Sequence, residues 1–362
     1  MSTDDLIRYG AAFVVTLFFV RLLSHLAERV GLVDHPCRRK RHRGAIPLIG
    51  GPAIFAGLLF AAPMLVDTLY PYRALLAGLA VLMIAGLLDD LRDLSPWQKF
   101  AAQLVAGLIM VSWGHTTVFH LGDLFGFGPV SLPNWAVPFT LVALLGLINA
   151  INLVDGADGL AAGLALLAFA FLAFGAMLTG RVVSLQLLLT VIAVLAAFWV
   201  MNMRFPWQPH ARVFLGDSGS MILGFLLTWL SIEVARAGEH RMPPIVAVWF
   251  LAVPLIDMGV VILRRLGRGH SPFRGGRDHF YHMLLAADLS PGAAVLTMLS
   301  LALGLATMAF LAWRAGVPDY WLFYGFLGLL AASWLMSVQW RWLLRRLRRT
   351  RRGRHGRRPL AA

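Results

Sequence analysis

Long apolar runs, separated by short polar or charged stretches, make up most of the chain. A helix needs about 20 apolar residues to cross the hydrocarbon of a bilayer, and lipid offers no partner for an open strand. The runs therefore predict an all-α, polytopic membrane protein with about eleven transmembrane helices. We expect these helices at residues 5–22, 46–66, 73–88, 99–114, 135–153, 160–179, 182–201, 219–235, 244–263, 292–313 and 320–340.

The basic residues give this arrangement an orientation. An odd number of spans places the two termini on opposite sides, and the great majority of the 32 Lys and Arg residues fall on the side of the carboxy terminus. Basic residues favour the cytoplasmic side. The sequence therefore predicts a bacterial inner-membrane protein with a periplasmic amino terminus and a cytoplasmic carboxy terminus. The first helix has no small-residue cleavage site after it and is expected to remain.

Two segments, residues 341–362 and 114–134, do not belong to the predicted spans. Residues 1–340 form the predicted membrane domain. The arginine-rich residues 341–362 form a cytoplasmic tail that is expected to bind anionic membrane lipids. Residues 114–134, rich in Gly, Phe and Pro, predict a short ribbon or a re-entrant turn, to which we assign no function.

Composition supports the membrane class and excludes others. The chain of 362 residues is 59% hydrophobic and 14% charged, with a mean hydropathy of +0.73. Its formal net charge of +14 lies in loops and a tail, without a soluble domain to bind nucleic acid, so no nucleic-acid partner is expected. The single cysteine, Cys37, excludes an internal disulfide.

The first candidate site is the sequence DDLRD at the end of the third predicted helix. It contains Asp89, Asp90 and Asp93, and Lys99 follows nine residues after Asp90. Adjacent carboxylates repel each other unless a cation lies nearby. A solvated helix end would explain one or two acids, whereas three acids and a lysine favour a phosphate or metal site.

The second is NAINLVDGADGL, at the end of the fifth predicted helix. Asn149, Asn152, Asp155 and Asp158 recur every three residues, which keeps their side chains near one helical face. Polar groups inside a membrane span indicate function unless they bond a neighbouring helix. Bonding between helices would explain the asparagines but not the two Asp-Gly steps, so we favour a ligand site.

The third is VFLGDSGS, residues 213–220, at the start of the eighth predicted helix. Asp217 lies where backbone N–H groups and a carboxylate could bind a phosphate and its metal, although Asp217 or Ser218 could also simply cap the helix. Phe214 is expected either to face lipid or to stack on a nucleobase.

The fourth is the basic stretch SPFRGGRDHFYH, which carries Arg274, Arg277, His279 and His282. The two histidines lack the further ligands of a zinc site, whereas guanidinium and imidazole groups suit phosphate recognition.

Two weaker candidates remain. In RRKRHRGAIPLIGG, the positive-inside rule explains most basic residues, and His42 or Arg43 could reach a phosphate. Asp257, in the sequence PLIDM near the cytoplasmic end of the ninth predicted helix, is expected either to pair with a basic group or to serve the site.

In this order, these motifs resemble the polyprenyl-phosphate N-acetylhexosamine-1-phosphate transferases over roughly residues 5–340. IPLIGG, PLIDM and SPFRGGRDHFYH are most similar to the bacterial branch that uses undecaprenyl phosphate and UDP-N-acetylglucosamine. The resemblance implies transfer of N-acetylglucosamine 1-phosphate to undecaprenyl phosphate with release of UMP, as the first membrane step of O-antigen or related surface-glycan synthesis. It also implies Mg²⁺, with Mn²⁺ as a substitute, and admits a homodimer.

The resemblance further implies a role for each matching residue. Asn152 and Asp217 would bind the metal, and Lys99 the diphosphate. Asp158 and Phe214 would form the uracil pocket, and Asp89 and Asp90 would face the lipid phosphate. Asp155, Arg277 and His279 would lie near the diphosphate and sugar, with His282 and Arg43 as further substrate contacts. The candidate catalytic residues are Asp89, Asp90, Asp155 and His279. Tyr281 stands where the family commonly has a histidine.

Several alternatives stay open. The lipid phosphate would attack the β-phosphorus directly, or an aspartate would first form a covalent intermediate. The sugar would be N-acetylglucosamine or another N-acetylhexosamine such as a 6-deoxy sugar. A membrane prenyltransferase would need a second DDxxD-like motif, and a transporter would place polar groups near the bilayer midplane rather than at one rim.

Overall fold

The computed structural model describes residues 3–35, 44–65, 70–236, 242–269 and 279–355, with side chains up to residue 340 except those of residues 64 and 65. Nearly all of the described chain is helical. The helices are α1 (Thr3–Val30), α2 (Gly50–Leu65), η1 (Tyr70–Tyr72), α3 (Arg73–Arg92), α4 (Pro96–Leu108) with its π-helical extension η2 (Ile109–Trp113), α5 (Ala136–Val154), α6 (Leu160–Leu178), α7 (Val182–Asn202), α8 (Gly216–Ala235), α9 (Pro244–Phe250), α10 (Ala252–Leu266), α11 (Phe280–Ala286), α12 (Pro291–Arg314) and α13 (Asp319–His355).

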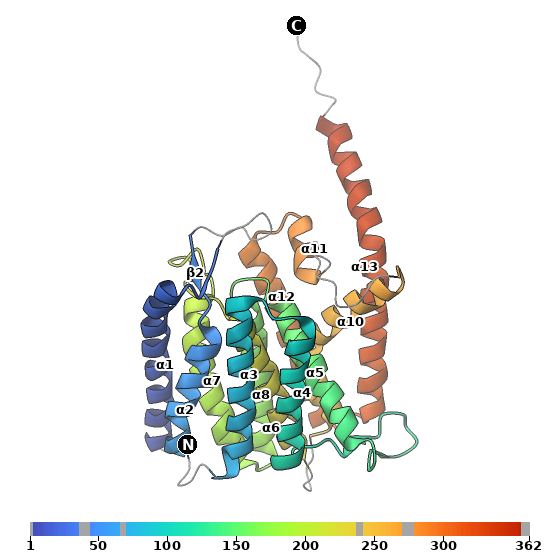
Figure 1. The fold of residues 1–362 in the computed structure, drawn as a ribbon. Coiled ribbons are helices and arrows are strands. Elements are labelled where there is room, and N and C mark those ends of the chain that lie inside the picture. The colour runs from blue at the N-terminus through green and yellow to red at the C-terminus, as the bar shows by residue number, and fades with distance from the viewer. Residues whose placement is uncertain (1–2, 36–43, 66–69, 237–241, 270–278, 356–362) are drawn as a thin grey trace.

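The long helices stand side by side as a bundle, with the start of α1 at one end and the end of α13 beyond the other (Figure 1). Among the described residues, eight helices are long and apolar enough to cross a membrane: α1, α3 with η1, α5, α6, α7, α8, α12 and the first part of α13. Each of the eleven apolar runs lies mainly on helix. The prediction of an all-α polytopic membrane protein is therefore confirmed.

The ninth predicted span is not one straight helix. It is divided at Leu251 into α9 and α10, whose axes differ by 81°. Pro254 supplies the physical reason, because it lacks an N–H group and its ring would clash with the carbonyl of Phe250 in a continuous helix. The prediction of one continuous span at residues 244–263 was wrong in this respect.

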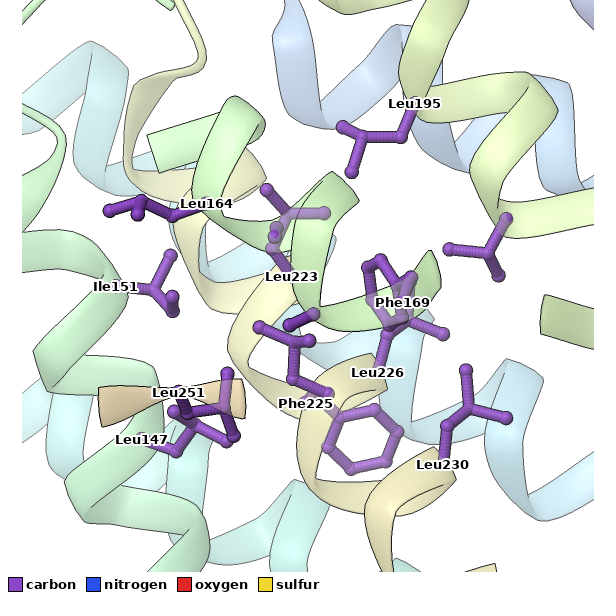
Figure 2. Packing of buried hydrophobic residues seen from close by; sticks show 14 of the residues in the cluster. Leu147, Ile151, Leu164, Phe169, Leu195, Leu223, Phe225, Leu226, Leu230 and Leu251 are labelled. Carbon is purple, nitrogen blue, oxygen red and sulfur yellow. The ribbon is translucent and has the colours of Figure 1, made fainter. Parts of the chain in front are cut away.

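Helix α8 lies at the centre of the bundle, and nearly all of its residues are buried. Figure 2 shows its side chains, including Leu223, Phe225 and Leu226, packed among residues of α5, α6 and α7. Two glycines allow this close packing. A Cβ atom on Gly86 of α3 would collide with the backbone of Ser218, and one on Gly224 would lie 2.5 Å from the Cα atom of Ile148. Small residues commonly permit such close helix contacts in membranes.

Two short hairpins lie at opposite ends of the bundle. Strands β3 (His120–Gly122) and β4 (Val130–Ser131) pair antiparallel, which confirms the predicted ribbon at residues 114–134. Strand β1 (Val33–Asp34) pairs with β2 (Ile46–Pro47), which leads into α2.

The segment that follows β2 joins α2 to the start of α8. The N–H group of Phe214 donates to the carbonyl of Pro47 at 2.8 Å, and the N–H group of Gly50 donates to the carbonyl of Phe214 at 3.0 Å. A side chain at Gly50 would leave its Cβ atom 2.6 Å from the Cα atom of Leu215. Gly50, the first glycine of IPLIGG, thus allows the backbone at the start of α2 to approach the backbone at the start of α8.

Candidate active site

The centre of the candidate site is a lysine that contacts two carboxylates. The ammonium of Lys99 forms an ion pair with Asp89, and its Nζ atom lies 3.4 Å from Oδ2 of Asp217. The Asp89 side chain is only 1% exposed, whereas those of Lys99 and Asp217 are about a third exposed. The cluster thus has one buried carboxylate and one that solvent or a ligand can reach.

The turn between α3 and α4 explains why Lys99 meets Asp89. Asp93 ends α3 in the left-handed conformation, with a φ of 49°, and the N–H group of Leu94 donates to Oδ1 of Asp89 at 2.7 Å. Ser95 then begins α4 through a capping box with Gln98. Because the chain reverses within these few residues, Lys99, in the first turn of α4, faces the end of α3.

Asp217 is also held from α5. The side-chain amide of Asn152 donates to Oδ1 of Asp217 and, at 3.0 Å, to the hydroxyl of Ser220. Asp217 lies in the first turn of α8, where the helix dipole favours a negative charge. The predicted pair of Asn152 and Asp217 therefore does come together, although the two residues are 65 positions apart.

Asp90 has a different task. Its carboxylate accepts hydrogen bonds from the N–H group of Asp217 at 2.8 Å, from the N–H group of Ser218 at 3.2 Å and from the hydroxyl of Ser218 at 2.9 Å. These groups would otherwise be unsatisfied donors at the start of α8. Asp90 thus caps α8 from a neighbouring helix and sets the position of Asp217.

That Asp89 and Asp90 face the lipid phosphate stays a prediction, and the structure adds the contacts that each residue makes within the protein. Asp89 is buried under Lys99, and both oxygens of Asp90 are taken by α8. In this arrangement both residues position other groups of the site.

A second cluster connects the turn after α5 to the loop between α7 and α8. Nε of Arg204 contacts Oδ2 of Asp158 at 2.7 Å, and the N–H group of Ala211 donates to the same oxygen at 3.2 Å. Asp158 is thereby attached to the loop that carries Phe214. Burial and the nearby Asp158 raise the pKa of Tyr281, although Arg204 opposes them, so this phenol is neutral at physiological pH.

A third pair links α10 to α11. Nδ1 of His279 lies 2.8 Å from Oδ2 of Asp257, and the N–H group of Phe280 donates to Oδ1 of Asp257 at 2.7 Å. The prediction that Asp257 pairs with a basic group is confirmed. His282 lies on the same short helix, one residue after Tyr281.

The remaining predicted residues make other contacts or lie outside the described residues. Asp155 ends α5, and its N–H group bonds to the carbonyl of Asn152. Asn149 donates to Gln103 of α4 at 3.2 Å, which is the contact between helices considered above for the asparagines. Arg43 and Arg277 lie outside the described residues.

Comparisons with known proteins identify the family of this chain. Residues 72–235, which include α3, α5 and α8 with the first two clusters, match the model of glycosyl transferase family 4. An undecaprenyl-phosphate alpha-N-acetylglucosaminyl 1-phosphate transferase of Haemophilus influenzae is 34% identical over 90% of this chain and 91% of its own length. The chain belongs to glycosyl transferase family 4.

Two further undecaprenyl-phosphate alpha-N-acetylglucosaminyl 1-phosphate transferases match most or nearly all of the chain. The protein from Pasteurella multocida is 34% identical over 96% of both chains, and that from Escherichia coli K12 is 34% identical over 88% of this chain and 86% of its own. This family 4 member is accordingly a transferase enzyme, and the family resemblance inferred from the motifs is confirmed.

Two site residues of this family 4 transferase escaped the sequence reasoning. Arg204 follows α7, and the positive-inside rule already explained a basic residue there. Asn202 donates to the carbonyl of Val213 and accepts from the N–H group of Gly159, so it ties the Asp158 loop to the start of α8. The composition offered one further indication that Lys99 is special. Of the 32 Lys and Arg residues in the chain, only Lys40 and Lys99 are lysines.

Proposed function

We propose that this enzyme transfers N-acetylglucosamine 1-phosphate from UDP-N-acetylglucosamine to undecaprenyl phosphate, giving undecaprenyl-diphosphate-N-acetylglucosamine and UMP. The observation that carries the proposal is the cluster of Lys99, Asn152 and Asp217 at one end of the bundle. The chain that holds it is 34% identical to two undecaprenyl-phosphate alpha-N-acetylglucosaminyl 1-phosphate transferases. The product would begin the synthesis of O-antigen or a related surface glycan.

The donor set of the first cluster fits magnesium. Mg²⁺ prefers oxygen ligands and is usually bound by one or two carboxylates together with substrate phosphates. Asp217 and Asn152 offer a carboxylate and an amide oxygen, while the described part of the chain holds no group of three His, Cys, Asp or Glu residues that would bind a metal by themselves. We assign Mg²⁺ to Asp217 and Asn152, with Mn²⁺ as a substitute. When bound with the diphosphate, the ion would neutralise its charge.

The protein's own groups account for the remaining steps. Phosphoryl transfer depends mainly on alignment and on neutralising charge, which fixed cations can supply. The lipid phosphate, whose second pKa is about 6, is largely a dianion at neutral pH and needs no strong base. It attacks the β-phosphorus while Lys99, held by Asp89, neutralises charge on the departing UMP. Asp90 keeps Asp217 in place through the start of α8.

The second and third clusters fit the rest of the donor substrate. Asp158 and Phe214 would bind uracil, with Arg204 fixing the orientation of Asp158. His279 would lie near the diphosphate and sugar, and Asp155, His282, Arg277 and Arg43 are proposed as further substrate contacts.

The chain would cross the bacterial inner membrane eleven times, counting α2, α4 with η2, and α9 with α10 as one span each. The site would face the cytoplasm, on the side of the Arg-rich tail, and the 114–134 hairpin would face the periplasm. Residues 1–340 would form the membrane domain and residues 341–362 the tail, into which α13 continues without a break.

The decisive experiment is transfer of radiolabelled sugar phosphate by purified protein. Undecaprenyl phosphate, Mg²⁺ and a panel of UDP-sugars should give a labelled lipid and equimolar UMP with UDP-N-acetylglucosamine. Turnover only with a 6-deoxy sugar would reassign the donor. Prenyl transfer without UMP, or flux through vesicles without turnover, would refute the proposal. A phospho-enzyme formed without lipid acceptor would refute direct attack.

A further inference from the structure

Asp257 is a buried carboxylate to which the mechanism above gives no task. It lies in the second turn of α10, just after the 81° bend, and only 6% of the residue is exposed. A carboxylate removed from solvent is costly unless hydrogen bonds satisfy it. Both of its oxygens are satisfied by the beginning of α11, one by the His279 ring and one by the N–H group of Phe280.

This contact determines which nitrogen of His279 carries a proton. An ionised carboxylate only accepts hydrogen bonds, so Nδ1 of His279 must be the donor. The contact with Asp257 does not use the other nitrogen, Nε2, which lies on the opposite edge of the ring. Because Phe280 is held by the same carboxylate, the ring and the adjoining backbone are fixed together.

We propose that Asp257 is a positioning residue of the transfer reaction, which holds His279 in its Nδ1–H form and thereby presents Nε2 as a hydrogen-bond acceptor to a hydroxyl group of the UDP-sugar. The inference rests on the proposed function, in which His279 lies near the diphosphate and sugar. A carboxylate behind a histidine fixes the tautomer and orientation of the ring in many catalytic and metal sites.

The fold supports this role over a general clamp between two helices. His279 is itself 9% exposed, so its ring is enclosed and cannot exchange orientations freely. It also begins α11 in an extended conformation, where its carbonyl accepts from the N–H group of Met283. Asp257 thus contacts His279, the residue at which α11 begins, and fixes the orientation of its ring.

The substitution Asp257→Asn tests this role with almost no change in volume. Its amide oxygen can still accept from Phe280, but its NH₂ group faces Nδ1 and favours the Nε2–H tautomer. We expect kcat for UMP release to fall about 10- to 100-fold, with little change in the KM for UDP-N-acetylglucosamine. Asp288→Asn, the same change at an exposed position beyond the other end of α11, is the matched control and should leave kcat unchanged.

A double-mutant cycle separates positioning from a structural role. In a His279→Ala background, Asp257→Asn should cause no further loss, because its effect passes through the ring. An equal loss in both backgrounds would overturn the proposal.

The tautomer can be observed without turnover. In protein with ¹⁵N-labelled histidine, the signal that disappears in His279→Gln should show a neutral ring protonated at Nδ1 and should change to Nε2–H in Asp257→Asn. A ring that carries a proton on Nε2 in the wild-type protein would overturn the proposal, even if the variants fail to fold. Failure of the proposed function would appear differently, as wild-type protein that releases no UMP.

Discussion

Replacing Lys99 by methionine tests the central ion pair most directly. Methionine has a similar length but no charge, so it leaves the carboxylates of Asp89 and Asp217 without their shared cation. Breaking a buried ion pair by removing one partner costs about 3–5 kcal/mol. Asp89 is 1% exposed, but the Lys99 side chain is 31% exposed and water screens part of the interaction. We therefore expect a loss of about 2 kcal/mol of stability.

The catalytic loss should be larger than the loss of stability. Fixed groups that neutralise developing charge are typically worth a factor of about 10²–10³ in kcat, and the ammonium of Lys99 lies 3.4 Å from Asp217. Lys99→Met should thus lower UMP release by about that factor and reduce the melting temperature of the detergent-solubilised protein by several degrees. Both quantities are measured on the same preparation.

The variant Lys99→Arg serves as the charge-preserving control. A planar guanidinium fork does not replace a compact ammonium between two carboxylates, so Arg should recover much of the melting temperature but little of the activity. Lys99→Met protein with wild-type melting temperature and wild-type kcat would refute the reasoning. Full activity of Lys99→Arg would show that charge alone is required.

Three further predictions concern other parts of the site. Asp217→Asn should abolish Mg²⁺-dependent UMP release while the protein still inserts into membranes; retained activity would remove Asp217 from the metal site. Arg204→Met should raise the KM for UDP-N-acetylglucosamine about tenfold, because loss of the ion pair with the partly buried Asp158 costs about 1–2 kcal/mol. An unchanged KM would contradict the assignment of Asp158 to the uracil pocket. Gly86→Val should destabilise the protein by about 1–3 kcal/mol through overpacking against α8 and lower kcat. Gly304→Ala, where nothing lies within 4 Å, should leave both melting temperature and kcat unchanged.

The motifs predicted where the chemistry would gather but not how its members divide the work. DDLRD predicted a phosphate or metal site that contains Asp89, Asp90 and Asp93. The structure places Asp89 under Lys99, Asp90 on the start of α8, and Asp93 at an exposed helix end. Side chains that are neighbours in sequence point in different directions around a helix end. Their spacing alone therefore could not predict which group each aspartate contacts.

The sequence by itself determined the class of the protein. Apolar runs of spanning length require helices, because lipid cannot satisfy a free backbone, and this constraint acts on each segment separately. It also determined the family, because the motifs are local strings of residues.

Only the tertiary structure decided the partners. Lys99 and Asp217 are 118 positions apart, and Asp90 and the Asp217 N–H group are 127 apart. The glycines that let α8 approach its neighbours and the bend between α9 and α10 set these contacts. Hydrogen bonds and ion pairs require positions within a few tenths of an ångström, and that precision arises from how the helices pack and not from the order of residues along any one of them.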